Sequence, residues 1–97
     1  MVNRDEYVAN LKGQLDRWSD QMASWESFAH RARHGTKTKL RKQIGILRSR
    51  LDDAIFRFEL VQSASADAWL DIKRGADEAR SSMEQALEKA RAHFKDI

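Results

Sequence analysis

Apolar side chains recur in steps of three and four residues along almost the whole chain, which is the spacing of one face of an α-helix. A first run extends from Val8 to Val61, and a second runs from Ala68 to Phe94. No proline interrupts either run, and the 97 residues include four glycines and no cysteine. Because β-sheet proteins need frequent turns, and small disulfide or zinc folds need cysteine, the pattern predicts a single all-α domain over residues 1–97.

Capping residues predict where the helices begin and end. Asn3, followed three residues later by Glu6, has the pattern of a capping box at the start of the first helix. The apolar stripe stops at the small and polar residues 63–67, where Ser65 is a suitable N-cap for the next helix. These signals predict one long helix over about residues 4–62 and a second helix over about residues 66–94.

Gly35 marks the point where the long helix is most open to a bend or break, at residues 34–37. Glycine is common just after a helix ends, and Thr36 is able to cap a new helix. A break would give three helices of similar length that close on themselves as a three-helix bundle. Without a break the chain is an antiparallel helical hairpin or coiled coil, and its N-terminal aromatic stripe stays uncovered unless copies pair. We favour the hairpin, with the bundle as the alternative, and therefore expect a homo-oligomer, either a dimer or a tetramer.

Large apolar side chains are expected to form the seam of that assembly, and they include all three tryptophans of the chain. The predicted seam consists of Trp18, Trp25, Leu40, Ile44, Leu51 and Trp69. Trp69 falls in the first turn of the last helix, where its ring is expected to fix the turn between the helices.

Charge is distributed unevenly along the chain. Residues 31–50 hold eight Lys or Arg and no Asp or Glu, whereas the segments on either side are acidic. Two interpretations stay open: the basic segment pairs with the acidic last helix, or it binds a polyanion, either nucleic acid or an anionic membrane. The residues predicted to contact such a polyanion are Arg31, Arg33, Lys37, Lys39, Arg41 and Lys42. No recognition motif accompanies them, so any binding should be sequence-independent and strongly dependent on salt.

Nothing in the sequence predicts catalysis, a metal site, a cofactor or a small-molecule substrate. Adjacent carboxylates occur at Asp52 and Asp53, but ion pairs with Arg48 and Arg57, four residues away along the helix, explain them better. No apolar run approaches the 18 or so residues of a membrane-spanning helix, so we expect a cytoplasmic protein. The predicted function is that of a non-enzymatic, self-associating coiled-coil interaction or structural protein, with polyanion binding through residues 31–50 as the alternative.

The opening of the chain and the segment around Trp69 carry distinctive patterns. They read Asn3-Arg4-Asp5-Glu6-Tyr7-Val8-x-x-Leu11-Lys12-x-Gln14-Leu15-Asp16-x-Trp18 and Ser65-x-Asp67-Ala68-Trp69-x-Asp71-Ile72-Lys73-x-Gly75, with Lys42-Gln43-Ile44 and Leu47-Arg48 between them. These patterns resemble a family of short bacterial coiled-coil proteins that are often labelled stress-response proteins. The resemblance implies a helical, cytoplasmic, non-enzymatic protein and a link to stress. It assigns no catalytic residue, and Gly35-Thr36 departs from the unbroken helix of that family.

Overall fold

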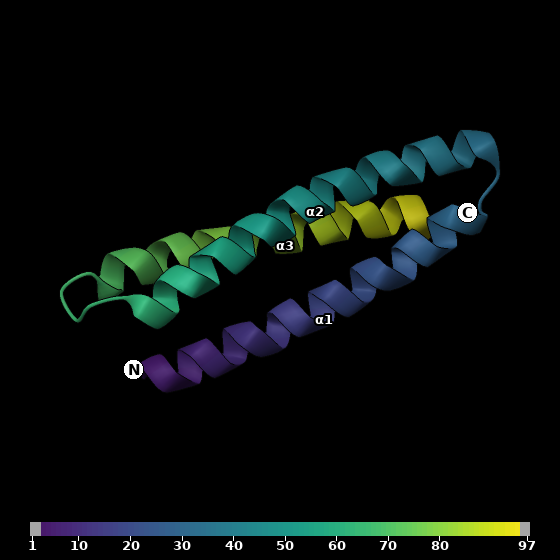
Figure 1. The fold of residues 1–97 in the computed structure, drawn as a ribbon. Coiled ribbons are helices and arrows are strands. Elements are labelled where there is room, and N and C mark those ends of the chain that lie inside the picture. Colours follow the sequence, from purple (N-terminus) through teal and green to yellow (C-terminus); the bar gives the residue numbers. More distant parts are fainter. Residues whose placement is uncertain (1–2, 96–97) are drawn as a thin grey trace.

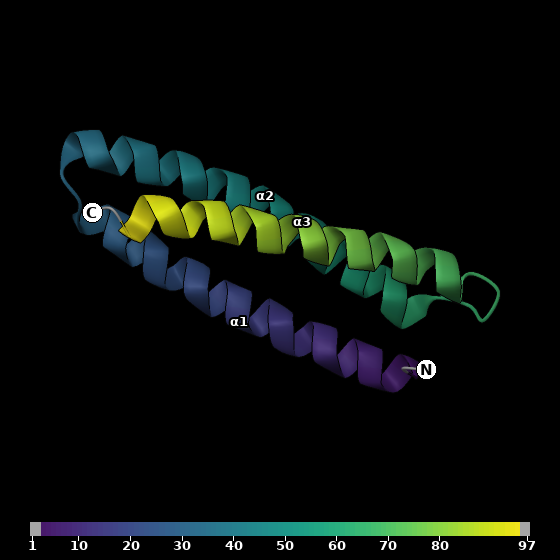
Figure 2. The same ribbon diagram turned by 180° about the vertical axis from the view of Figure 1, so that it is seen from behind.

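Three helices joined by two short connections make up the computed structural model, which describes residues 3–95. Helix α1 spans Arg4–Arg31, α2 spans His34–Ser63 and α3 spans Trp69–Lys95. Successive helices run in opposite directions, so that the α1–α2 connection and the end of α3 share one end of the molecule (Figures 1 and 2). The N-terminus of α1 and the α2–α3 connection lie at the other end of a rod of 51 × 19 × 17 Å. The all-α prediction is confirmed, and the three-helix alternative is the arrangement observed.

The predicted continuous helix over residues 4–62, and with it the two-helix hairpin, is wrong. The chain leaves the helix at Ala32 and Arg33, whose extended backbones have ψ angles of 159° and 153°, and α2 starts at His34. The break therefore precedes Gly35, which lies in the first turn of α2, and no residue from 3 to 95 has a positive φ angle. The reversal lets the apolar stripe of α1 fold back onto its own chain. A continuous helix would leave that stripe in water.

The start of α2 has no side-chain cap, in contrast to the start of α1. Arg33 occupies the N-cap position of α2 without making a capping hydrogen bond, and the first turn contains no acidic residue. At the start of α1, the Asn3 side chain accepts a hydrogen bond from the Glu6 amide at 2.8 Å. Before α3, the Ser65 hydroxyl accepts one from the Ala68 amide at 3.3 Å. The predicted cap at Asn3 is confirmed. Ser65 caps only the turn that precedes α3, because regular α3 begins at Trp69, three residues later than the predicted position 66.

Replacing Arg33 by Asn is expected to raise the free energy of unfolding by about 1 kcal/mol. Arg33 already has the extended backbone of an N-cap residue, so an Asn side chain there could accept a hydrogen bond from an amide of the first turn of α2. Thermal unfolding followed by circular dichroism should then show a melting temperature higher by roughly 4–8 °C. Arg33→Ala is the control, because it removes the same charge without supplying a cap. An equal rise in the melting temperature of both variants would show that the stabilisation comes from removing charge repulsion and not from the new cap.

The core is a continuous row of apolar side chains contributed by all three helices. Of the predicted seam, Trp18, Trp25, Leu40, Ile44 and Leu51 are all buried, and Trp69 is half-buried against the same core. Trp25 stacks on Phe94 of α3 with ring centroids 4.6 Å apart. These side chains are thus covered within one chain, so the uncovered stripe that required a second copy does not occur in this fold. Self-association stays a prediction.

Candidate polyanion-binding surface

Positive charge gathers in the half of the rod that contains the α1–α2 connection. This half, which we call the basic end, comprises residues 18–48 and 82–95 and holds ten Lys or Arg against four Asp or Glu. The other described half, residues 3–17 and 49–81, holds eight against ten. The antiparallel course of α3 brings its C-terminal cations Lys89, Arg91 and Lys95 to the basic end (Figure 2). These three residues are not among the six contacts predicted from the sequence. Their position could have been predicted, because antiparallel packing of the last helix on α2 places its C-terminus beside the start of α2.

The six predicted contact residues all lie at the basic end. Arg31 is the last residue of α1, Arg33 lies in the connection, and the other four belong to the first three turns of α2. Five of them are exposed, and Lys37 is half-buried. Their cationic groups are therefore available to a partner on the outside of the molecule.

The cations of the two halves differ in their ion pairing. Within residues 3–95, five of the eight Lys or Arg of the less basic half form salt bridges: Lys12, Arg57, Lys73, Arg74 and Arg80. At the basic end only one of ten does so, namely Arg48, which pairs with Glu26 of α1. In the described part of the chain, no ion pair joins residues 31–50 to α3. The interpretation that the acidic last helix neutralises the basic segment through ion pairs is therefore not supported.

The orientation of α3 explains why three of its acidic residues, Asp77, Glu84 and Glu88, form no ion pair with the basic segment. Asp77 faces α1, because its carboxylate accepts a hydrogen bond from the Tyr7 hydroxyl at 2.6 Å. Glu84 and Glu88 follow seven and eleven residues later, close to two and three full helical turns, so they lie on the same side of α3 as Asp77. This acidic stripe is directed toward the α1 side of the bundle and away from α2.

No protein-family model, curated protein or solved structure matches this chain. The resemblance to short bacterial coiled-coil proteins therefore stays an expectation. What the chain binds has to be inferred from its own surface.

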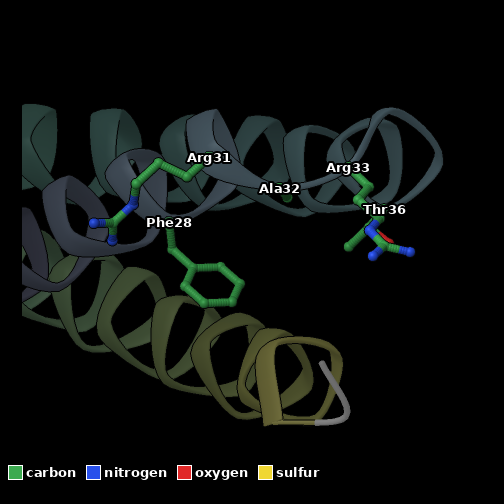
Figure 3. Close-up of a pocket in the computed structure, with 5 residues that line it drawn as sticks. All are labelled: Phe28, Arg31, Ala32, Arg33 and Thr36. Carbon is green, nitrogen blue, oxygen red and sulfur yellow. The ribbon is translucent and has the colours of Figure 1, made fainter.

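A shallow hollow of about 350 Å³ lies at the α1–α2 connection and is lined by Phe28, Arg31, Ala32, Arg33 and Thr36. Figure 3 shows the Phe28 ring directed toward the end of α3, whereas the side chains of Arg31 and Arg33 extend in different directions. The two guanidinium groups therefore do not converge on one small anion. Their arrangement suits several separate phosphates spread along a polymer.

The His and Glu residues near the break do not form a metal site. Glu26, His30 and His34 have helical spacing in the sequence, but the break at Ala32 and Arg33 separates His34 from the other two. Glu26 is also engaged by Arg48. No group of three potential metal ligands occurs among the residues that the structure describes.

A cluster around Tyr7 holds α1 against α3 in the less basic half. The Tyr7 ring packs edge-on against Trp69 with ring centroids 5.5 Å apart, and its hydroxyl donates to Asp77. Burial and this hydrogen bond raise the pKa of Tyr7 to about 12. Burial raises the pKa of Asp77, but the hydrogen bonds from Tyr7 and Lys73 outweigh it and hold that pKa below its ordinary value. The polar groups of this cluster form hydrogen bonds with one another, so its role is structural, and we call it the clasp.

Tyr7 is the only tyrosine of the chain, so its ionisation can be followed directly by ultraviolet absorbance. We expect a midpoint near pH 12, above the ordinary value of 10.0. Because the folded-state pKa is raised, the stability that the clasp provides is present below pH 10 and is lost as the pH rises toward 12. Asp77→Asn should lower the midpoint, since it removes a negative charge beside the hydroxyl. A midpoint at the ordinary value in the folded wild-type protein would contradict the clasp.

Proposed function

We propose that this chain is a non-enzymatic helical interaction protein whose basic end binds nucleic acid through its phosphate backbone. The observation that supports this proposal is the pairing contrast: one of ten cations at the basic end has a salt-bridge partner within residues 3–95, against five of eight elsewhere. Exposed cations without a protein partner hold only solvent counterions. They can exchange these for phosphates.

Binding of this kind is favoured mainly by the release of counterions from the nucleic acid. Each Lys or Arg that neutralises a phosphate frees a condensed cation, which gains entropy in dilute salt. The side chains at the basic end are spread over the last turn of α1, the connection and the start of α2. Such a spread follows a charged backbone without reading base edges, so we propose sequence-independent binding.

An anionic membrane is less well supported than nucleic acid. Interfacial binding needs exposed apolar area beside the positive charge. The tryptophans that would supply it, Trp18 and Trp25, are only 8% and 9% exposed. Among the large hydrophobic residues that the structure describes near the α1–α2 connection, only Phe28 is exposed, at 38%. No helix among residues 3–95 is long and apolar enough to cross a membrane.

The test is fluorescence anisotropy with a labelled DNA duplex of about 20 base pairs at low salt. A variant with Arg31→Glu, Arg33→Glu and Arg41→Glu is expected to bind about a hundredfold more weakly than wild type. The matched control carries Lys12→Glu, Arg17→Glu and Arg74→Glu in the less basic half, with the same change in net charge, and should lose much less. Circular dichroism confirms that both variants fold.

Two outcomes would overturn the proposal. The first is an absence of duplex binding by the wild-type protein at low salt. The second is an equal loss in the two triple variants, which would show that only net charge matters. Light scattering on the same samples measures the oligomeric state and so tests the separate prediction of self-association.

A further inference from the structure

A polar groove of about 290 Å³ runs between α2 and α3 at the boundary of the basic end. It is lined by Gln43, Ile46 and Arg50 from α2 and by Ser82, Gln85, Ala86 and Lys89 from α3. Arg50 and Lys89 are exposed, and neither forms a salt bridge within the described chain. The groove thus combines cations with amide and hydroxyl groups, which are the groups that bind phosphate oxygens.

The register of α2 against α3 places the two cations apart along the groove. A Cβ atom added at Gly75 would meet the Arg57 guanidinium at 3.1 Å, so Arg57 lies opposite Gly75. Seven residues further along the antiparallel pair, Arg50 lies beside Ser82, and seven more bring Gln43 beside Lys89. Arg50 and Lys89 are therefore separated by about 10 Å along the rod, at 1.5 Å per residue. That distance corresponds to about three base pairs of a duplex.

None of the seven residues that line this groove is acidic, and Glu78 lies one turn before Ser82, beyond the end of the groove that is away from the basic end. The α2 wall belongs to residues 34–51, which contain no Asp or Glu. On α3, Glu84 and Glu88 share the face of Asp77, which is hydrogen-bonded to α1. Lys39 and Lys42 lie one turn before Gln43 and Ile46 and continue the α2 wall of the groove toward the basic end.

The groove between α1 and α2, by contrast, has acidic side chains in its lining. It is lined in part by Glu26, Arg48 and Asp52, and Arg48 pairs with Glu26. Its one cation is thus already neutralised, and a further carboxylate lies beside it. Of these two grooves along α2, the one shared with α3 is the one suited to a polyanion.

We infer that the α2–α3 groove seats the phosphodiester backbone of a nucleic-acid duplex, an inference that rests on the proposed function. Lys39, Lys89 and Arg50 neutralise phosphates at separate positions along the groove. The side chains of Gln43, Ser82 and Gln85 donate hydrogen bonds to phosphate oxygens between them. The groove contains no aromatic ring on which an unpaired base could stack, which favours a duplex over a single strand. Its lining includes only Ile46 as a large apolar side chain, which does not suit insertion into a lipid surface.

The test compares two double variants by the dependence of duplex affinity on salt. Arg50→Ala with Lys89→Ala removes two cations from the groove, whereas Arg17→Ala with Arg74→Ala removes two exposed cations from the less basic half, outside the groove. The probe is a labelled DNA duplex of about 20 base pairs, titrated from about 50 to about 200 mM salt. The slope of log K against log salt should be less negative by about 2 in the groove variant, because two phosphate contacts are lost. The control variant should keep the wild-type slope.

The remaining outcomes separate the groove from the proposed function. If the wild-type protein binds the duplex and the groove variant keeps its slope, the groove assignment fails and the proposed function stands. If the wild-type protein does not bind the duplex at about 50 mM salt, both fail. Tighter binding to a single strand of the same length would overturn the duplex assignment. Binding to vesicles containing phosphatidylserine without binding to DNA would show that the ligand is an anionic lipid surface and would overturn the proposed nucleic-acid binding.

Discussion

The affinity of the wild-type protein for a DNA duplex is expected to fall at least about a thousandfold when salt rises from about 50 to about 200 mM. The six predicted contact residues have no salt-bridge partner within residues 3–95, so each is available to neutralise one phosphate. These six contacts alone predict a slope of log K against log salt of about −5, and the groove cations Arg50 and Lys89 would steepen it to about −7. Anisotropy titrations at four or more salt concentrations would measure this slope.

The control for this experiment replaces the added salt by a neutral osmolyte of equal osmolality, which leaves the counterions unchanged. Affinity should then change little. A slope near zero in salt would contradict a phosphate-based interface and would point to apolar contacts. A slope no steeper than about −2 would mean that most of the six predicted residues do not reach the duplex.

Leu47→Ala is expected to lower the free energy of unfolding by about 2–5 kcal/mol, the largest effect on stability that we predict. Leu47 is 1% exposed in the middle of the core, so its truncation leaves a cavity among the three helices. A domain of this length has a total stability of roughly 5–15 kcal/mol. The variant should therefore be partly unfolded or melt far below wild type.

The matched control for Leu47→Ala is Ile46→Ala, one residue earlier on the same helix. Ile46 is 43% exposed, so its truncation should cost less than about 1 kcal/mol. Urea unfolding followed by circular dichroism gives both free energies, and comparable denaturant slopes would show that both variants unfold from a similar compact state. Equal losses would mean that the apolar face of α2 is assigned wrongly.

Local rules are sufficient for the helical character of the chain, for the start of α1 and for part of the surface pairing. The cap at Asn3 and the pair between Asp53 and Arg57, at 3.7 Å, involve residues three or four apart, so helix geometry alone determines them. Helical spacing predicts a pair between Arg48 and Asp52 as well, but Arg48 pairs with Glu26 of α1. Such a pair depends on which helix lies alongside. The sequence pattern does not contain that information.

The break between α1 and α2 has no local signal at the residues where it occurs. Alanine and arginine are both good helix formers, and the nearby glycine at position 35 lies inside α2. Helix propensities differ by less than about 1 kcal/mol per residue, whereas burial of the α1 stripe involves several large side chains. Tertiary burial therefore outweighs local preference at Ala32 and Arg33. The α3 cations reach the basic end through the antiparallel packing of α3 on α2, which the predicted hairpin already implies.

The charge imbalance between the two halves also gives the molecule a permanent electric dipole along its 51 Å axis. In the field of a nucleic acid this dipole turns the diffusing rod, so that the basic end arrives first and encounters are oriented before contact. The opposite end of the rod, with the start of α1 and the α2–α3 connection, carries the acidic excess. Under the proposed function this end is repelled by the phosphates, which favours contact through the basic end and the adjoining α2–α3 groove, and the repulsion weakens as the ionic strength rises.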